Sequence, residues 1–181
     1  RFEEIADSGA ISVLAKPANG GHRVVCLRLT LLPLDTTSAD ELATFAFWMM
    51  ERLTWDPYVQ VHGLCCLSDY HSMSLRQFTQ IWSLIPLSVR AEYSRCFAAR
   101  YGPIRIYNAP AFVVAIWRLM RSLLPFKIVS RVKFLNAYDA TAVDFMDPQD
   151  VPAPFNPCGA PCEATMRGWL RRQIEIGRAH V

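Results

Sequence analysis

Apolar residues follow two different spacings along this chain, and the change from one to the other predicts its elements. Short apolar runs bounded by turn residues predict strands at residues 23–29, 62–69, 104–107 and 132–135. Apolar residues three or four positions apart predict helices at residues 39–53, 86–100 and 110–124. Because strands alternate with helices, the pattern predicts an α/β fold with a mostly parallel sheet. Shorter helical pieces are expected at 74–84 and 139–145, while residues 2–18 show no sustained period.

The helix expected at residues 39–53 carries a start signal. Ser38 and Glu41 have the spacing of a capping box, in which each side chain accepts a hydrogen bond from the other residue's backbone N–H. Behind this cap the apolar positions fall on one stripe and predict the buried side of the helix: Leu42, Phe45, Ala46 and Met49.

A chain of 181 residues suits one domain with a real core. We expect a truncated N-terminal segment at residues 1–14, the main domain at 15–165 and a C-terminal helix fragment at 166–175. Residues 176–181 resemble one reading frame of a common sequencing-adapter oligonucleotide and are set aside as read-through.

Residues 110–124 are unusual because almost every position is apolar. Pro110 suits the first helical position, and Pro125 would end the helix. The only charges, Arg118 and Arg121, lie three apart and so on one face. At about 1.5 Å per residue the helix is too short for a bilayer core of about 30 Å. It is therefore a core helix, a lipid-facing helix, or one that exchanges between the two environments.

Basic residues are concentrated in one part of the chain. The net charge is +3, yet residues 90–133 contain nine Lys and Arg residues against one acid, Glu92. This concentration favours an anionic partner: a phosphoinositide, an anionic membrane or nucleic acid. The simpler explanation is a solvated helix face. Nucleic acid is the weakest of these partners, because the basic residues flank an apolar helix and no recognition motif accompanies them.

Motifs of catalysis, cofactor binding and metal binding are missing from the sequence. There is no glycine-rich phosphate loop and no Gly-x-Ser-x-Gly turn. Asp69 and His71 follow a predicted strand, but such a pair more often forms a cap and a surface histidine. Cys158 and Cys162 lack a nearby His or Cys pair that would complete a zinc site. We therefore expect no enzyme activity, no cofactor and no metal.

The order and spacing of several elements resemble a known family. These elements are the strand at 63–69, the helix ending at Phe97, the step Ile104-Arg-Ile-Tyr-Asn-Ala-Pro110 and the basic run 121–131. The segment Asn19-Gly-Gly-His-Arg-Val-Val25 fits the family's first turn and strand. Together they resemble a CRAL-TRIO domain, closest to the animal branch of the α-tocopherol transfer, retinaldehyde-binding and clavesin proteins. The likeness covers roughly residues 15–165.

The resemblance implies a sheet that floors an apolar lipid cavity and a mobile gate, residues 109–130, that closes it. By position, the residues lining this pocket would be Leu64, Cys66, Ser68, Val89, Tyr93, Phe97, Ile104, Phe112, Ile116, Leu119 and Met120. Relatives bind phosphoinositide headgroups beside the gate, and the corresponding residues here are Arg100, Lys127 and Arg131. One further basic position of that set is Gly102 in this chain, for which Arg105 and Arg121 could compensate.

This sequence departs from the family's pattern at three points. Ala99 stands where fungal phosphatidylinositol-transfer members carry an acid, so their headgroup coordination is poorly supported. The family's closing Leu-Pro-x-x-Phe/Tyr-Gly-Gly segment is Val151-Pro-Ala-Pro-Phe-Asn-Pro-Cys-Gly here. The helical domain that usually precedes this fold does not occur in the sequence.

The resemblance and the charge pattern together predict a monomer that binds a hydrophobic lipid and transfers it between membranes without catalysis. We expect it to be cytoplasmic and peripheral on endosomal or other intracellular membranes, docked on phosphoinositide or anionic lipid; cysteines placed in apolar runs also favour a reducing compartment. Sterol, tocopherol, retinoid, squalene-like and phospholipid cargo all fit. Two other classes stay open. One is a phosphoinositide-sensing module of a larger signalling protein, and the other is an enzyme using Asp69, His71 or Cys96.

Overall fold

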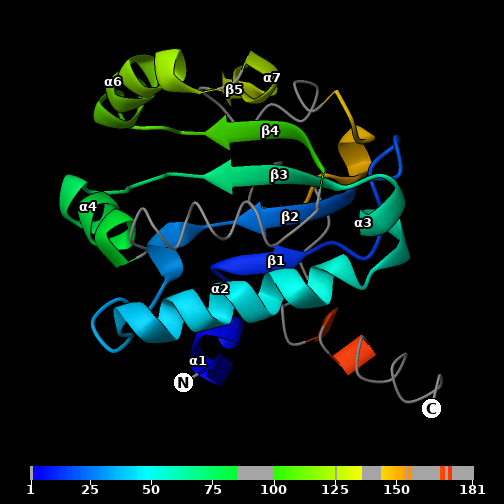
Figure 1. The fold of residues 1–181 in the computed structure, drawn as a ribbon, viewed down its shortest axis with the longest axis horizontal. Coiled ribbons are helices and arrows are strands. Elements are labelled where there is room, and N and C mark those ends of the chain that lie inside the picture. The colour runs from blue at the N-terminus through cyan, green and yellow to red at the C-terminus, as the bar shows by residue number, and fades with distance from the viewer. Residues whose placement is uncertain are drawn as a thin grey trace.

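Five strands form a single sheet in the order β1-β2-β3-β4-β5 (Figure 1). They are β1 (Ile11–Val13), β2 (Arg23–Leu27), β3 (Leu64–Asp69), β4 (Tyr101–Tyr107) and β5 (Val132–Leu135). Strands β2 to β5 are parallel, and β1 pairs antiparallel with β2. The prediction of an α/β fold with a mostly parallel sheet is confirmed.

The structure is a computed structural model that describes residues 2–84, 100–124, 126–135, 144–153, 155, 168–169 and 171–172. Its helices in these ranges include α1 (Phe2–Asp7), α2 (Ala39–Thr54), α3 (Pro57–Val61), α4 (Leu75–Leu84), α6 (Ala111–Met120) and α7 (Phe126–Val129). Short 3-10 turns occur at Leu29–Leu31, Arg121–Leu123 and Pro148–Asp150. The helical pieces expected at 86–100, 139–145 and 166–175 lie largely outside the described residues.

The helices are placed so that the two ends of the sheet differ (Figure 1). Helix α2 runs alongside the sheet next to β1, while α4 and α6 lie beyond the carboxyl ends of β3 and β4. Helix α3 lies at the opposite end, where the strands begin. The carboxyl end of the sheet is therefore bordered by α4 and α6, and the amino end by the short helix α3.

Helix α2 begins as its sequence signal predicts. The Ser38 side chain accepts from the Glu41 N–H (3.2 Å), and the Glu41 carboxylate accepts from the Ser38 N–H (2.9 Å). On the buried side, Leu42, Phe45 and Met49 are buried in the core, as their spacing requires. The capping box is confirmed, and so is the stripe except for Ala46, which is half-buried.

Three elements differ from the sequence expectation. Strand β1 was not predicted, because its three residues are too few to show an alternation of apolar and polar positions. Helix α4 is a full helix of ten residues, started by Ser74 and Gln77, whose side chains each accept from the other residue's backbone N–H. Helix α6 ends at Met120 rather than Leu124, and a 3-10 turn follows it. The gate segment, residues 109–130, is therefore broken into a helix, a turn and the short helix α7.

One face of the sheet is densely packed. Side chains that alternate along β2, β3 and β4 meet residues from the Pro-rich C-terminal part of the chain. No member of this cluster is more than 8% exposed: Leu14, Ala18, Val24, Cys26, Cys65, Leu67, Tyr107, Phe145, Met146, Val151 and Phe155. Side chains on this face contact one another directly, and this face therefore has no room for a ligand among the described residues.

The amino end of the sheet is held by a buried ion pair. Arg23 Nε donates to Asp56 Oδ2 (2.8 Å), and the guanidinium also donates to the carbonyl of Ala15 (2.7 Å). The other oxygen of Asp56 accepts from the Tyr58 N–H (2.9 Å) and so caps α3. Asp56 is 2% exposed and Arg23 8% exposed. The pair therefore fixes α3 to the start of β2.

Candidate functional site

On the second face of the sheet, an apolar floor extends over β3, β4 and β5. The core that α2 forms with this face contains Val25 of β2 and Leu64 at the start of β3. Beyond that core, register partners form two rows across the three strands. All of them except buried Ser68 are half-buried: Cys66, Ile104 and Val132 in the first row, and Ser68, Ile106 and Phe134 in the second. These six residues are called the apolar floor.

The polar groups on the apolar floor are uncharged. The thiol of Cys66 lies 3.3 Å from the Ser68 hydroxyl. Burial raises the pKa of Cys66 to about 11, although the hydrogen bond with Ser68 lowers it in part. Burial, and then the neighbouring Cys66, raise the pKa of the Tyr70 hydroxyl to about 12. The floor therefore suits a neutral ligand, and Cys66 is no thiolate nucleophile at neutral pH.

Helix α6 packs at the carboxyl end of the apolar floor. Val113 is buried with Met73 and Phe78, and Ile116 packs against the same cluster. The Phe112 ring meets the Phe78 ring edge-on at 5.6 Å between centroids. Phe134 of β5, which belongs to the apolar floor, packs against the same cluster. One side of α6 therefore faces both α4 and the floor.

The turn from β4 into α6 explains the Asp69 and His71 pair. Asn108 adopts a left-handed backbone conformation (φ +51°), which Asn tolerates better than most residues. Its side-chain amide donates to Asp69 Oδ1 (3.0 Å), which also accepts from the His71 N–H (2.9 Å). Asp69 thus ties the carboxyl ends of β3 and β4 together, and the His71 side chain is exposed. This geometry fits a structural cap rather than an acid–base pair.

The outer side of the gate segment exposes large apolar side chains. Leu119, Leu123 and Phe126 are 75%, 76% and 84% exposed. Met120 and Ile128 are exposed as well. Exposed cations alternate with these side chains along the segment: Arg118, Arg121 and Lys127. Large apolar groups interleaved with cations form a surface suited to a bilayer interface.

The structure brings part of the predicted pocket together. Cys66, Ser68 and Ile104 belong to the apolar floor, and Phe112 and Ile116 lie half-buried at its carboxyl end. Val89, Tyr93 and Phe97 lie outside the described residues.

Three predicted pocket residues lie elsewhere. Leu64 is buried in the core beneath α2, because it lies at the start of β3, which α2 covers. Leu119 and Met120 are exposed, because the last turn of α6 extends beyond the cluster that packs its first turns. In this structure they belong to the outer surface of the gate segment.

The predicted headgroup residues also separate into two groups. Arg100, Arg121 and Lys127 are exposed, and Arg131 is half-buried, with its guanidinium donating to the carbonyl of Tyr101. Arg105 is only 3% exposed and is salt-bridged to Asp144 at 2.5 Å. Arg105 therefore cannot replace, at the open surface, the basic residue that Gly102 lacks.

A hollow of about 400 Å³ opens at the amino end of β4, and it is called the amino-end hollow. Sequence reasoning missed three of its residues, His22, Lys133 and Asp144, as members of a site. They come from three separate segments, so no local spacing connects them. Among the described residues its lining is His22, Gly102, Pro103, Arg105, Ser130, Arg131, Lys133 and Asp144.

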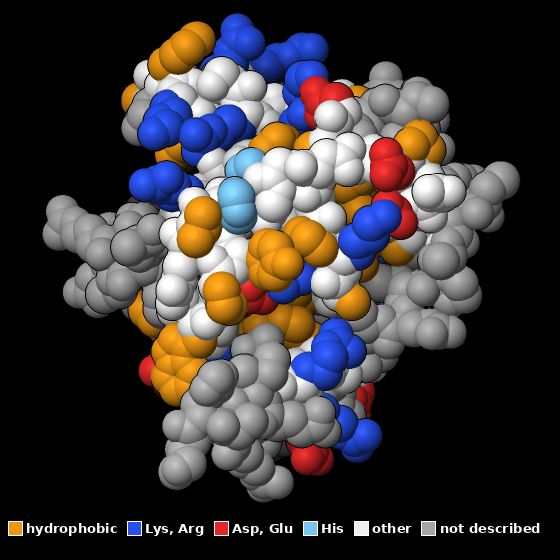
Figure 2. All heavy atoms as spheres, turned by 90° about the vertical axis from the view of Figure 1, so that its right-hand side faces the viewer, with side chains coloured by type: hydrophobic (Ala, Val, Ile, Leu, Met, Phe, Trp, Pro, Cys, Tyr) orange, Lys and Arg blue, Asp and Glu red, His pale blue; other side chains and the backbone are white. Residues whose placement is uncertain are grey.

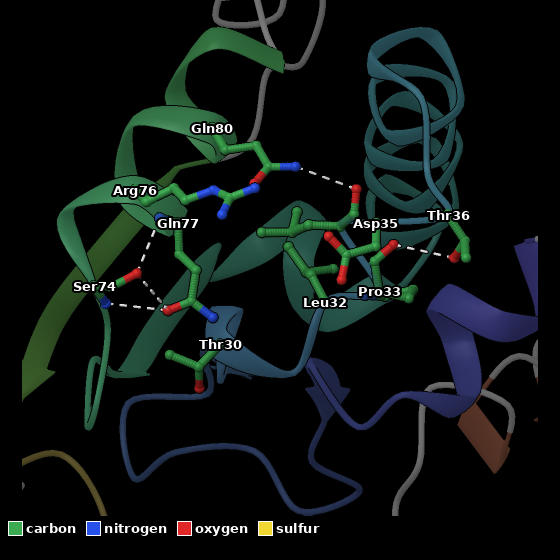
Figure 3. A pocket seen from close by; sticks show the side chains of 10 residues that line it. Thr30, Leu32, Pro33, Asp35, Thr36, Ser74, Arg76, Gln77 and Gln80 are labelled. Carbon is green, nitrogen blue, oxygen red and sulfur yellow. Dashed lines mark hydrogen bonds between the residues drawn. The ribbon is translucent and has the colours of Figure 1, made fainter.

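A second hollow, of about 570 Å³, lies between α4 and the loop at residues 30–36 (Figure 3). Its walls are mainly polar and make local hydrogen bonds, such as Gln80 Nε2 to the Leu34 carbonyl (3.2 Å). Ser74 and Gln77 lie on its α4 side, where they cap that helix. The polar walls of this second hollow do not suit the apolar ligand that is expected over the apolar floor.

No three His, Cys, Asp or Glu side chains among the described residues come together as a metal site. In the same part of the chain, no helix combines the length and the apolar character needed to cross a bilayer.

Comparison with known proteins identifies the family. The model of the CRAL/TRIO domain family matches residues 7–156, so the chain belongs to this family, whose members bind and transfer lipophilic ligands. The mouse "Alpha-tocopherol transfer protein-like" is 24% identical over 150 residues, which cover 83% of this chain and 43% of that protein. Rat "Clavesin-1" is 22% identical over 165 residues, covering 90% of this chain and 46% of that protein. The chain thus spans less than half the length of these relatives.

A solved structure supports the same fold. The "Crystal structure of Sfh5" superposes with a TM-score of 0.64 at 12% identity, covering 92% of this chain and 60% of that chain. At this identity the likeness concerns the fold alone. The resemblance to a CRAL-TRIO domain that the sequence indicated is confirmed.

Proposed function

We propose that this chain binds a neutral lipophilic molecule over the apolar floor and transfers it between membranes. The observation that carries this proposal is the contrast between the two faces of the sheet. One face is closed by its own side chains, whereas β3, β4 and β5 present half-buried apolar side chains on the other. Burial of apolar ligand area contributes about 25 cal/mol per Å² before association costs are subtracted. A floor of this kind is therefore a suitable surface for lipid cargo.

The gate segment gives the proposed cargo a route. A lipophilic ligand cannot enter a closed cavity, so part of the wall must move. The gate segment packs inward through few residues, with Val113 alone buried in α6, and exposes Leu119, Leu123 and Phe126 outward. When it opens, a bilayer can take up the apolar surface that water would disfavour. We therefore assign the gate segment both roles, lid and membrane contact.

Basic residues beside the gate segment hold the proposed complex on an anionic membrane. Arg100, Arg121 and Lys127 are exposed, and Arg131 lies at the edge of the amino-end hollow. Each Lys or Arg close to an anionic surface contributes about 1 kcal/mol, which falls off as salt is added. The proposed protein is a monomer that works in the cytoplasm and attaches peripherally to endosomal or other intracellular membranes.

Removing two of these cations tests the docking step. Lys127→Ala/Arg131→Ala should weaken binding to vesicles of phosphatidylcholine with a phosphoinositide by about 10- to 30-fold. Co-sedimentation at low and high salt measures this loss, which should shrink as salt rises. Lys16→Ala/Arg76→Ala is the matched control, because it removes the same charge from exposed positions outside this surface. Equal binding by both double variants would contradict electrostatic docking here.

A phosphoinositide-sensing module that transfers nothing is the second candidate. The exposed cations of the gate segment favour it equally, because they need no cargo to bind a headgroup. A vesicle-to-vesicle transfer assay with a fluorescent sterol or tocopherol separates the two. Transfer by the wild-type chain supports a lipid-transfer protein, whereas vesicle binding without transfer supports a phosphoinositide-sensing module.

A further inference from the structure

The connection between β4 and α6 has three residues, Asn108, Ala109 and Pro110, and each has a restricted backbone. The ring of Pro110 fixes its φ (−57°), and a residue before proline, here Ala109, is kept out of the helical conformation. Asn108 has a left-handed backbone (φ +51°), which few residues other than glycine adopt. Asn108 is therefore the residue of this connection with the most freedom to change its conformation.

On its sheet side, Asn108 is fixed in place. Tyr107, the last residue of β4, is fully buried, and its carbonyl accepts from the Tyr70 N–H (3.0 Å). The Asn108 N–H donates to the carbonyl of Leu135 at the end of β5 (3.1 Å). A rotation of the Asn108 backbone would therefore leave the sheet where it is and swing only the chain that follows, which is α6.

The Asn108 side chain bonds to a buried carboxylate. Its amide donates to Asp69 Oδ1 (3.0 Å), and the same oxygen accepts from the His71 N–H (2.9 Å). Asp69 is only 8% exposed. Because a side chain turns with its own backbone, a change of Asn108 to an extended conformation would carry the amide away from Asp69. Hydrogen bonds to charged acceptors are among the stronger ones, so this bond offsets the cost of the left-handed backbone.

The two ends of the gate segment are held differently. Where the segment returns to the sheet, the Arg131 carbonyl accepts from the Ile104 N–H (2.9 Å) and from the Arg105 guanidinium (3.1 Å). Figure 2 looks onto this end of the molecule, where Lys and Arg side chains gather beside the histidines. At the other end, α6 begins without a side-chain cap and buries Val113 alone. The start of the gate segment is therefore held by the Asn108 hydrogen bond and a small apolar cluster.

We propose that Asn108 is the hinge of the gate segment and that Asp69 is the latch that holds the segment closed. Opening turns Asn108 out of its left-handed conformation, breaks its hydrogen bond with Asp69 and swings α6 away from the apolar floor. Both are positioning residues, which act through α6 and need no contact with the ligand. This inference rests on the proposed function, since a gate serves a ligand that must enter and leave.

A latch of this kind controls the rates of ligand exchange more than the affinity. Association needs the open state, and dissociation needs the closed complex to open. A weaker latch favours opening by the same factor with and without ligand, so both rates rise by that factor while the open state stays minor. The dissociation constant is then almost unchanged. Damage to a ligand site instead raises the dissociation constant without faster association, so the association rate separates the two roles.

Asn108→Gly tests the latch, because glycine adopts the left-handed conformation freely but cannot donate to Asp69. We expect association and dissociation of a fluorescent sterol or tocopherol to become about tenfold faster, with the dissociation constant within about twofold of the wild-type value. Stopped-flow fluorescence measures both rates. Ser72→Gly is the matched control, because Ser72 is also left-handed (φ +60°) but is exposed and leads into α4. Ser72→Gly should leave both rates unchanged.

Two further variants keep the test decisive should Asn108→Gly fold poorly. Asn108→Ala loses the hydrogen bond and also strains the left-handed backbone, so it should exchange ligand faster still. Asp69→Asn keeps an oxygen that accepts but removes its charge, and it should accelerate exchange less than Asn108→Gly does.

Three results would overturn the inference. Unchanged association rates in the Asn108 variants would remove the hinge. An equal acceleration in Ser72→Gly would make the effect general to the loops at this end of the sheet. A higher dissociation constant without faster association would give Asn108 a structural role alone. These results contradict the inference in a chain that binds the probe, whereas a wild-type chain that binds no lipophilic probe contradicts the proposed function and the hinge with it.

Discussion

Ile116→Asp should abolish uptake of a lipophilic ligand, lowering its affinity by about 100-fold or more. Ile116 is half-buried on the side of α6 that packs against the cluster around Phe78, at the carboxyl end of the apolar floor. A carboxylate there must lose its water or force the gate segment away from the floor, and an unpaired buried charge costs several kcal/mol. Binding of a fluorescent sterol or tocopherol measures the loss, with circular dichroism and melting to confirm folding.

Leu119→Asp is the matched control for this experiment. It introduces the same charge into the same helix one turn later, where the side chain is 75% exposed. Ligand uptake should therefore persist in Leu119→Asp, while partition onto membranes should fall. Should the two variants lose ligand equally, the assignment of an inner and an outer side to α6 would be wrong.

Asp56→Ala should lower the free energy of unfolding by about 3–5 kcal/mol. The substitution leaves the Arg23 guanidinium buried with only backbone carbonyls as acceptors, and it also removes the cap of α3. Urea unfolding measures the change. Asp56→Asn separates the two causes, because its amide oxygen can still cap α3 while the charge is lost.

An exposed aspartate provides the reference for this stability effect. Asp35→Ala alters a solvated side chain in the loop before α2 and should change the unfolding free energy by no more than about 0.5 kcal/mol. An Asp56→Ala variant as stable as Asp35→Ala would mean that the buried pair does not hold the amino end of the sheet. A cost shared equally by Asp56→Ala and Asp56→Asn would assign the whole effect to the lost charge.

The sequence predicted those elements whose signals are local. The capping box at Ser38 and Glu41 located the start of α2, and the apolar run at 132–135 matched β5 at both ends. Cys66 and Ser68 are two positions apart in a strand that the sequence indicates, so they lie on one face of the sheet. Each of these features depends on neighbours within a few positions, which the sequence shows directly.

What the sequence did not predict depends on contacts between distant segments. Leu64 shares a face with Cys66, but only the path of α2 decides that Leu64 is buried in the core. The end of α6 at Met120 depends on where the packed cluster stops, since Leu119 and Met120 are as apolar as the residues before them. The salt bridge between Arg105 and Asp144 joins residues 39 positions apart. No local pattern shows any of these three facts.

The role of Arg105 illustrates how burial changes a prediction. From the sequence it was a candidate to compensate for Gly102 in binding a headgroup at the surface. In the structure it alternates with Ile104 along β4 and points to the other face, where it is 3% exposed and 5.4 Å from the Phe145 ring centre. Arg105 therefore lies at the base of the amino-end hollow and not on the open surface.

Native mass spectrometry of the purified chain tests the central claim, that the apolar floor holds a lipophilic ligand. After expression in cells or incubation with lipid extract, the chain should carry one small lipophilic molecule that organic solvent removes. The Ile116→Asp variant should carry none, and Leu119→Asp should carry the same molecule as the wild-type chain. A folded wild-type chain that retains no lipid under either condition would contradict the claim.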